Sequence, residues 1–129
     1  MDDKLIPEEI AQFLTDTVDS VAQLEALLLL RNNPDEKWTN DYLAQRLYIS
    51  PKLTSELLTQ LCANSLVESY GFEPVCFRYR PASKEVEALI ARLAELYAKH
   101  LVPVTNLIHS KPKTRIQEFA DAFRLRKDK

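Results

Sequence analysis

The chain has 129 residues, of which 46% are hydrophobic and 28% charged, and this length suffices for one domain with its own core. A single glycine together with abundant leucine favours a mostly helical protein over a β-sandwich or β-barrel. The single glycine also excludes a glycine-rich phosphate loop, and the sequence contains neither a nucleophile elbow nor a zinc-protease motif. We therefore do not expect an enzyme.

The net charge of −2 is unevenly distributed along the chain. Residues 1–41 contain ten acidic and three basic residues, residues 42–83 three acidic and four basic, and residues 84–129 six acidic and ten basic. Proteins that bind DNA through its phosphates usually concentrate basic residues on the contact surface. The middle segment is nearly neutral, and the acidic front and basic tail could pair with each other within one subunit or across a dimer.

Targeting and membrane signals are weak in this sequence. The apolar run Leu27–Leu30 is too short to cross a bilayer. The chain begins with Asp2 and Asp3 rather than with a basic signal-peptide segment. We expect a cytoplasmic protein that does not contact a membrane.

Metal binding has little support either. Cys62 and Cys76 are the only cysteines, and His100 and His109 lie nine residues apart, so neither pair has the spacing of a metal site. We expect reduced thiols that pack as small residues, and histidines that lie at the surface or in the packing. No metal and no cofactor is predicted.

Residues 1–19 are predicted to form an N-terminal helical extension. Three apolar residues recur there at helical spacing: Ile10, Phe13 and Leu14. Ser20 can cap a second helix, which is rich in leucine around most of its circumference and ends before Pro34. A helix with so wide an apolar arc is expected at the centre of the core.

The stretch from Trp38 to Pro81 is spaced as a helix, a tight turn, a second helix and a hairpin. Thr39 and Ser50 are predicted N-caps, and proline after Ser50 suits the first helical position. The predicted apolar positions of the two helices are Leu43, Ala44 and Leu47 in the first and Leu53, Leu57, Leu58 and Leu61 in the second. Gly71 lies in a turn, and residues 75–80 alternate with period two, as a strand does. This order predicts a winged helix-turn-helix domain over residues 20–82.

Residues 39–50 (TNDYLAQRLYIS) resemble the threonine, leucine-alanine, leucine, isoleucine-serine signature of bacterial winged-helix transcription regulators. Leu66-Val67-Glu68 resembles the start of their wing. These regulators often have glycine before the leucine-valine pair, where this chain has Ser65, and their recognition helix and wing are usually more basic. The resemblance implies a mainly α fold with a small β-hairpin, and a MarR-like arrangement in which flanking helices form a homodimer. It also implies transcriptional regulation through binding of double-stranded DNA.

In a winged helix the second helix of the motif enters the major groove. The predicted DNA-binding residues are Lys52, Thr54, Ser55 and Thr59 on that helix and Arg78 and Arg80 on the hairpin. Further candidates for phosphate contacts are Tyr42, Arg46 and Tyr48. For the two hairpin arginines the alternative is pairing with acidic residues such as Glu68 across the hairpin.

Residues 83–129 are predicted to be a C-terminal helical dimerisation region. Ser83 can cap a long helix, which Pro103 should bend or divide. The predicted dimerisation residues are Leu89, Leu93, Leu96, Tyr97, Phe119 and Phe123. The last two could instead pack on the body of their own subunit, or belong to an arm that docks on another protein.

The sequence thus predicts a DNA-binding transcriptional regulator that acts as a homodimer. One alternative is a winged-helix protein-interaction module with little or no DNA binding, in which Phe72 at the wing tip faces a protein partner. Another is ligand-responsive regulation through an apolar cavity between the dimer helices near Tyr97 and His100.

Overall fold

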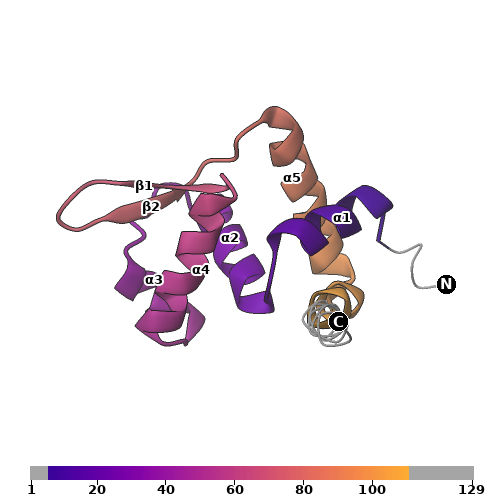
Figure 1. The fold of residues 1–129 in the computed structure, drawn as a ribbon, viewed down its shortest axis with the longest axis horizontal. Helices are drawn as coiled ribbons and strands as arrows, with labels where there is room; N and C mark the ends of the chain where they lie inside the picture. Colours follow the sequence, from indigo (N-terminus) through magenta and orange to yellow (C-terminus); the bar gives the residue numbers. More distant parts are fainter. Residues whose placement is uncertain (1–5, 111–129) are drawn as a thin grey trace, which may run out of the picture.

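A computed structural model describes residues 6–110 of the chain (Figure 1). Its elements in order are α1 (Glu8–Thr17), α2 (Val21–Asn32), α3 (Asn40–Leu47), α4 (Pro51–Ala63), β1 (Val67–Tyr70), β2 (Cys76–Tyr79) and α5 (Lys84–Lys99). Residues 101–110 are also helical. The prediction of a mainly α fold with a winged helix-turn-helix and a small hairpin is confirmed. No helix within residues 6–110 is long and apolar enough to cross a membrane.

Hydroxyl side chains start four of the helices at the predicted positions. Ser20, Thr39, Ser50 and Ser83 each accept a hydrogen bond of 3.1 Å from the backbone N–H three residues further on. Each such cap stabilises a helix by about 1 kcal/mol, because it satisfies a backbone donor that has no partner inside the helix. The caps on α3 and α4 fix where both helices of the motif begin.

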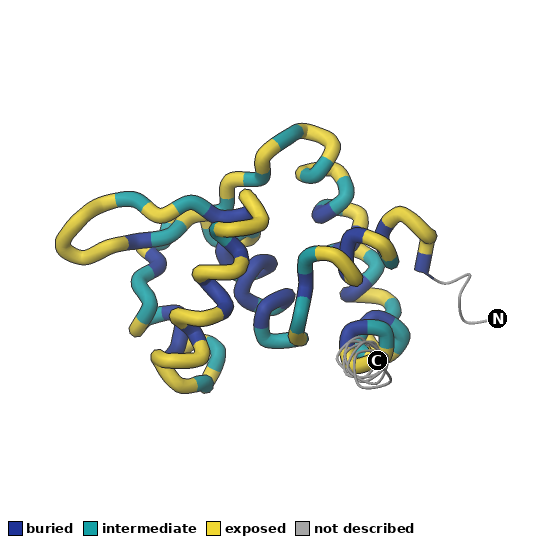
Figure 2. Tube along the Cα trace, viewed as in Figure 1, coloured by how far each residue is buried: buried dark blue, intermediate teal, exposed yellow. Residues whose placement is uncertain are grey.

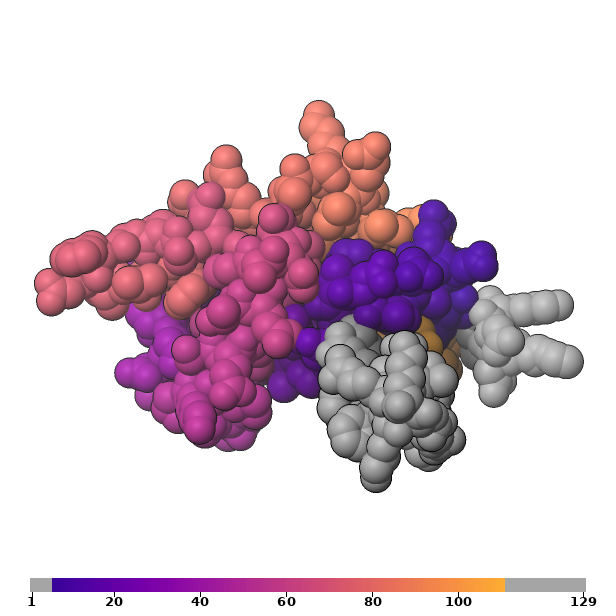
Figure 3. Space-filling model, viewed as in Figure 1, coloured from indigo at the N-terminus to yellow at the C-terminus, as the bar shows by residue number. Residues whose placement is uncertain are grey.

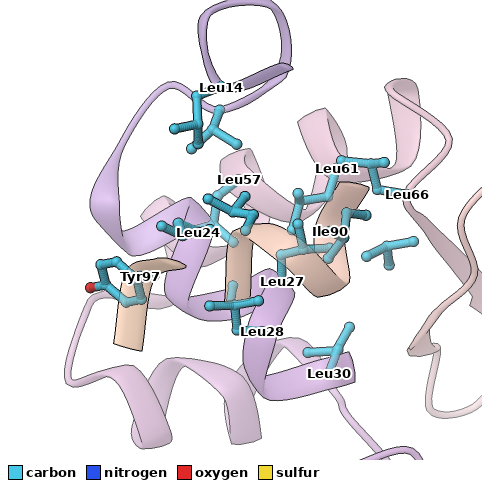
Figure 4. Packing of buried hydrophobic residues seen from close by; sticks show 14 of the residues in the cluster. Leu14, Leu24, Leu27, Leu28, Leu30, Leu57, Leu61, Leu66, Ile90 and Tyr97 are labelled. Carbon is cyan, nitrogen blue, oxygen red and sulfur yellow. The ribbon is translucent and has the colours of Figure 1, made fainter. Parts of the chain in front are cut away.

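The core is built around α2, as its wide apolar arc predicted. Leu24, Leu27 and Leu30 are fully buried, and α2 packs against α3, α4 and β2. Figure 2 shows α2 as a largely buried segment between more exposed helices. In Figure 4 the α2 leucines lie close to Leu61 of α4 and Ile90 of α5, so one core joins the motif to the helices that flank it.

The hairpin forms a wing that extends away from the helices (Figures 1 and 3). Its two strands are antiparallel, with Glu68 opposite Arg78. The base of the wing is anchored by Trp38, which is buried and whose carbonyl accepts a 2.8 Å hydrogen bond from the Phe77 N–H. The segment before α3 therefore holds the wing in place beside the motif.

Ser65 joins α4 to the wing in an unusual backbone conformation. Its φ of 60° lies in the left-handed region. Its N–H donates to the Cys62 carbonyl at 3.0 Å, and the Leu66 N–H donates to the Leu61 carbonyl at 3.1 Å. The bacterial winged-helix regulators that this sequence resembles often have glycine at this position. The positive φ accounts for that preference, because glycine adopts positive φ without steric cost.

The predicted division of the C-terminal helix is confirmed. Helix α5 ends at Lys99, and His100 leaves the helical conformation with φ −132° and ψ 59°. A proline in a helix removes one backbone donor and clashes with the carbonyl four residues earlier, which for Pro103 is the carbonyl of Lys99. Helix 101–110 then starts with the Val104 N–H donating to the His100 carbonyl at 3.3 Å.

The structure corrects two of the predicted dimerisation residues. Leu93 is fully buried and Tyr97 is nearly so, both inside their own subunit. The Tyr97 hydroxyl also donates a 2.5 Å hydrogen bond to Glu25 of α2. The apolar stripe of α5 thus completes the core of its own domain. Leu89 and Leu96 are partly buried against the same core, whereas Phe119 and Phe123 lie outside the described residues.

Candidate nucleic-acid interface

The α3–α4 turn sets the start of α4, the second helix of the motif. Tyr48 ends α3 in the left-handed conformation, with φ 58°. The Ile49 N–H then donates to the Ala44 carbonyl at 3.1 Å. Across the turn, the Asn40 side-chain amide donates to the Pro51 carbonyl at 3.0 Å. These bonds tie the first turn of α4 to α3, so that side chains in this turn are held at a defined position.

Three of the four residues predicted on α4 are exposed and share its outer surface: Lys52, Ser55 and Thr59. The Thr59 hydroxyl donates to the Ser55 carbonyl at 2.8 Å, which leaves the hydroxyl oxygen as an acceptor. Glu56 is exposed on the same helix. With one lysine and one glutamate, α4 has no net charge of its own, and any attraction to phosphate depends on where Lys52 lies.

The prediction that Thr54 contacts DNA is wrong. Thr54 is fully buried, and its hydroxyl donates to the Ser50 carbonyl at 2.9 Å. The buried positions of α4 are Thr54, Leu57, Leu58 and Leu61, which follow the i, i+3, i+4, i+7 spacing of one helix face. Leu53 lies one residue off that spacing and is 44% exposed. The sequence prediction placed Leu53 on the buried stripe because it gave more weight to apolar character than to spacing.

On the wing, both predicted arginines are exposed and both pair with Glu68. The Nε and Nη2 atoms of Arg78 each lie 2.7 Å from Glu68 Oε2. Arg80 Nε lies 3.6 Å from Glu68 Oε1. The guanidinium of Arg78 also lies 4.6 Å from the centre of the Tyr70 ring, within the range of a cation–π contact. The alternative of pairing across the hairpin is thus realised, and the cluster retains one net positive charge.

A third arginine is held on α3 by aromatic rings. Arg46 Cζ lies 5.3 Å from the centre of the Trp38 ring and 5.8 Å from that of Tyr42. The Tyr42 hydroxyl accepts from Arg46 at 3.1 Å and donates to Glu36 at 2.7 Å. Arg46 is exposed, and its orientation is restricted by these contacts.

Large exposed apolar side chains also mark this part of the molecule. Tyr48 in the α3–α4 turn is almost fully exposed, and Phe72 at the wing tip is 87% exposed. Leu53 on α4 is also exposed. Sequence reasoning missed this exposure, and the spacing of Thr54 from Leu57 and Leu58 was the signal that could have revealed it.

A hollow between α1 and helix 101–110 lies away from α4 and the wing. It encloses about 680 Å³ and is lined by Ile6, Glu8, Ala11, Val102, Pro103, Asn106 and Leu107. The hollow beside His100 is smaller, about 230 Å³, and its lining includes Arg92, Glu95 and Lys99.

In the part of the chain that the structure describes, the side chains that could bind a metal are dispersed. Within residues 6–110 no three histidine, cysteine, aspartate or glutamate side chains gather in a way that could hold a metal ion. Cys76 is buried and Cys62 partly buried, and burial raises the pKa of the Cys62 thiol. Both cysteine side chains therefore occupy packed positions.

Comparison with known proteins identifies the fold. No family model and no curated protein matches the sequence. The homodimeric winged helix-turn-helix DNA-binding domain Mb0332 from Mycobacterium bovis, a possible ArsR-family regulator, is 20% identical over 72% of this chain and 82% of that chain, with a TM-score of 0.54. The adhesin competence repressor AdcR from Streptococcus pyogenes is 16% identical over 88% and 84%, with a TM-score of 0.54. MepR of S. aureus, solved in complex with DNA, is 14% identical over 87% and 86%, with a TM-score of 0.55. The chain therefore has the winged helix-turn-helix fold found in these transcription regulators.

Proposed function

We propose that this protein is a cytoplasmic transcriptional regulator that binds double-stranded DNA as a homodimer. The observation that carries the proposal is the exposed surface of α4, which begins at a capped, tethered turn with Lys52 and is flanked by a wing bearing two exposed arginines. Among the structural neighbours, MepR was solved on DNA and Mb0332 is described as a homodimeric DNA-binding domain. A shared fold alone does not establish function, so the proposal rests on these side chains.

In this mechanism α4 enters the major groove by its first turns. Lys52 contacts a phosphate, and the positive end of the helix dipole favours the same anion. Ser55 and Thr59 offer hydroxyl groups to phosphates or to base edges.

The wing holds the backbone beside the groove. Arg78 and Arg80 both reach Glu68 and exchange part of that pairing for phosphate oxygens. Exposed ion pairs of this kind contribute only about 0–1 kcal/mol, so the exchange requires little free energy.

For the homodimer we propose a contact surface formed by α1 and helix 101–110 rather than by the stripe of α5. Leu101 and Val102 are 53% and 62% exposed, and Val102 lines the apolar hollow against α1. Phe119 and Phe123 follow this helix in the sequence and remain proposed dimerisation residues. On this proposal the N-terminal extension and the C-terminal region both serve assembly, while residues 20–82 bind DNA.

The first test is binding of the purified protein to random duplex DNA, measured by fluorescence anisotropy at several salt concentrations. Lys52→Ala and Arg78→Ala should each weaken binding to all sequences and reduce the slope of log affinity against log salt by about one, because each removes about one phosphate contact. The matched control is Lys84→Ala, which removes an exposed lysine at the start of α5 and should leave both quantities unchanged. Unaltered affinity in both test variants would contradict the assignment.

The second candidate function is a protein-interaction module, and the wing tip favours it. Phe72 is 87% exposed and Val75 is also exposed, whereas α4 has no net charge. In the same assay, no binding to duplex DNA at low salt would support this function over the regulator.

A further inference from the structure

Leu53 is an exposed leucine in the first turn of the helix that the proposed function places in the major groove. Its backbone N–H donates to the Ser50 hydroxyl at 3.1 Å, so the N-cap sets its place on the helix surface. Hydrophobic burial alone would put leucine inside and threonine outside. Here 44% of Leu53 is exposed while the next residue, Thr54, is fully buried.

The rest of the exposed α4 surface is mostly polar and carries no arginine. Its exposed members besides Leu53 include Lys52, Ser55, Glu56, Thr59 and Gln60, and helix Pro51–Ala63 contains neither arginine nor asparagine. Arginine or lysine is the usual partner of guanine in the major groove, and asparagine or glutamine that of adenine, so Lys52 and Gln60 are the candidates for purine contacts on this surface. Leu53 is the largest apolar side chain that this surface presents.

Thymine is the base that an apolar side chain can recognise. In the major groove it presents a 5-methyl group, which makes favourable contact with apolar side chains. We propose that Leu53 packs against a thymine 5-methyl group and makes the DNA preference of this protein depend on that methyl. The inference rests on the proposed function, and in a homodimer it predicts one such thymine in each half-site.

The experiment uses a duplex selected from random DNA by the full-length protein. Each thymine in the selected site is replaced in turn by deoxyuridine, which pairs in the same way but lacks the 5-methyl group. For the wild-type protein, affinity should fall about fourfold at one thymine position per half-site, the value expected for burying a single methyl group. Leu53→Ala should bind the thymine and uracil duplexes equally at that position.

Two further variants make the test specific. Leu53→Asn keeps the length and branched shape of the side chain but replaces its two methyl groups with a polar amide, and it should lose the discrimination as Leu53→Ala does. Gln60→Ala changes an exposed polar residue of the same helix, and it should retain the fourfold ratio whatever its overall affinity. Thermal melting checks that each variant is folded. We expect folded variants because Leu53 and Gln60 are both exposed.

Three results would overturn the inference while leaving the proposed function intact. The protein could bind DNA in a salt-dependent way without selecting any sequence, or select a sequence in which no uracil replacement lowers the affinity. Alternatively, both Leu53 variants could show the same ratio of thymine to uracil affinity as the wild-type protein. Failure of the wild-type protein to bind any duplex at low salt would overturn both, and would assign the exposed leucine to a protein surface instead.

Discussion

Ser65 shows how one backbone angle can be costly for the residue that adopts it. Its φ of 60° places the Cβ atom near the following carbonyl oxygen, at a cost of about 1–2 kcal/mol for an L-residue. The side chain is exposed and has no packing to lose. The hydrogen bonds from Ser65 and Leu66 back to α4 keep the residue in this conformation despite the cost.

Ser65→Gly should therefore stabilise the fold by about 1 kcal/mol, since the relieved strain exceeds the extra entropy that glycine gives the unfolded chain. Chemical denaturation measures the change as a higher transition midpoint at an unchanged m-value. Ser69→Gly is the matched control: Ser69 is exposed in the middle of β1, where glycine weakens a strand, so the midpoint should fall. A lower midpoint for Ser65→Gly would contradict the strain argument.

Among the elements, a contact between α2 and α5 joins the helix-turn-helix part of the fold to the helix that follows the wing. At its centre Tyr97 donates to Glu25 at 2.5 Å. Burial, together with the hydrogen bond and the negative charge of Glu25, raises the pKa of Tyr97 to about 12. The protonated phenol is the form that fits this site, because the phenolate would be desolvated and would face a carboxylate.

The raised pKa predicts a loss of stability in alkali. A group whose pKa is higher in the folded protein contributes its full stabilisation below the unfolded pKa of about 10 and loses it as the pH rises towards about 12. The free energy of unfolding should thus fall by up to about 2–3 kcal/mol between these pH values because of Tyr97. Urea denaturation at several pH values from about 8 to 11.5 measures this fall in the free energy of unfolding. Tyr97→Phe should show a shallower decline, and an equally steep decline would rule out Tyr97 as its source.

At the scale of the whole molecule, a second exposed apolar surface lies away from α4 and the wing. Leu101 and Val102 are exposed beside the hollow that α1 forms with helix 101–110. Figure 1 places these helices on the side of the molecule opposite the wing. A twofold contact there would leave both copies of α4 and of the wing free.

Val102→Glu should shift the protein from dimer to monomer, because a charge in an apolar contact is desolvated without a partner. Light scattering with size-exclusion chromatography gives the mass directly. The control is Ala98→Glu, an exposed position on α5 outside the lining of the hollow, which should leave the mass unchanged. A dimeric mass for Val102→Glu would move the interface elsewhere.

The sequence predicted the local structure well, since caps and periodicity act within a few residues. The four hydroxyl caps, the central α2 and the division near Pro103 all follow from such short-range rules. The errors concern which face of a helix meets which neighbour. Thr54 was expected at the surface and Leu53 in the core, but Thr54 is buried and Leu53 is exposed. Leu93 was expected to contact a partner subunit, but it lies in the core of its own subunit. An amphipathic stripe shows that a helix is covered on one side, but it does not show by what.

The break at His100 has a geometric consequence for a dimeric regulator. Helix α5 is part of the core that holds α4, whereas helix 101–110 packs on that core through Val104 and Ile108 and presents Leu101 and Val102 to the proposed contact with the second copy. The angle between these two helices then fixes how far apart the two copies of α4 stand. B-DNA presents successive equivalent major-groove faces about 34–36 Å apart. The proline that interrupts the helix would thus determine the spacing between half-sites at which both subunits can bind one duplex.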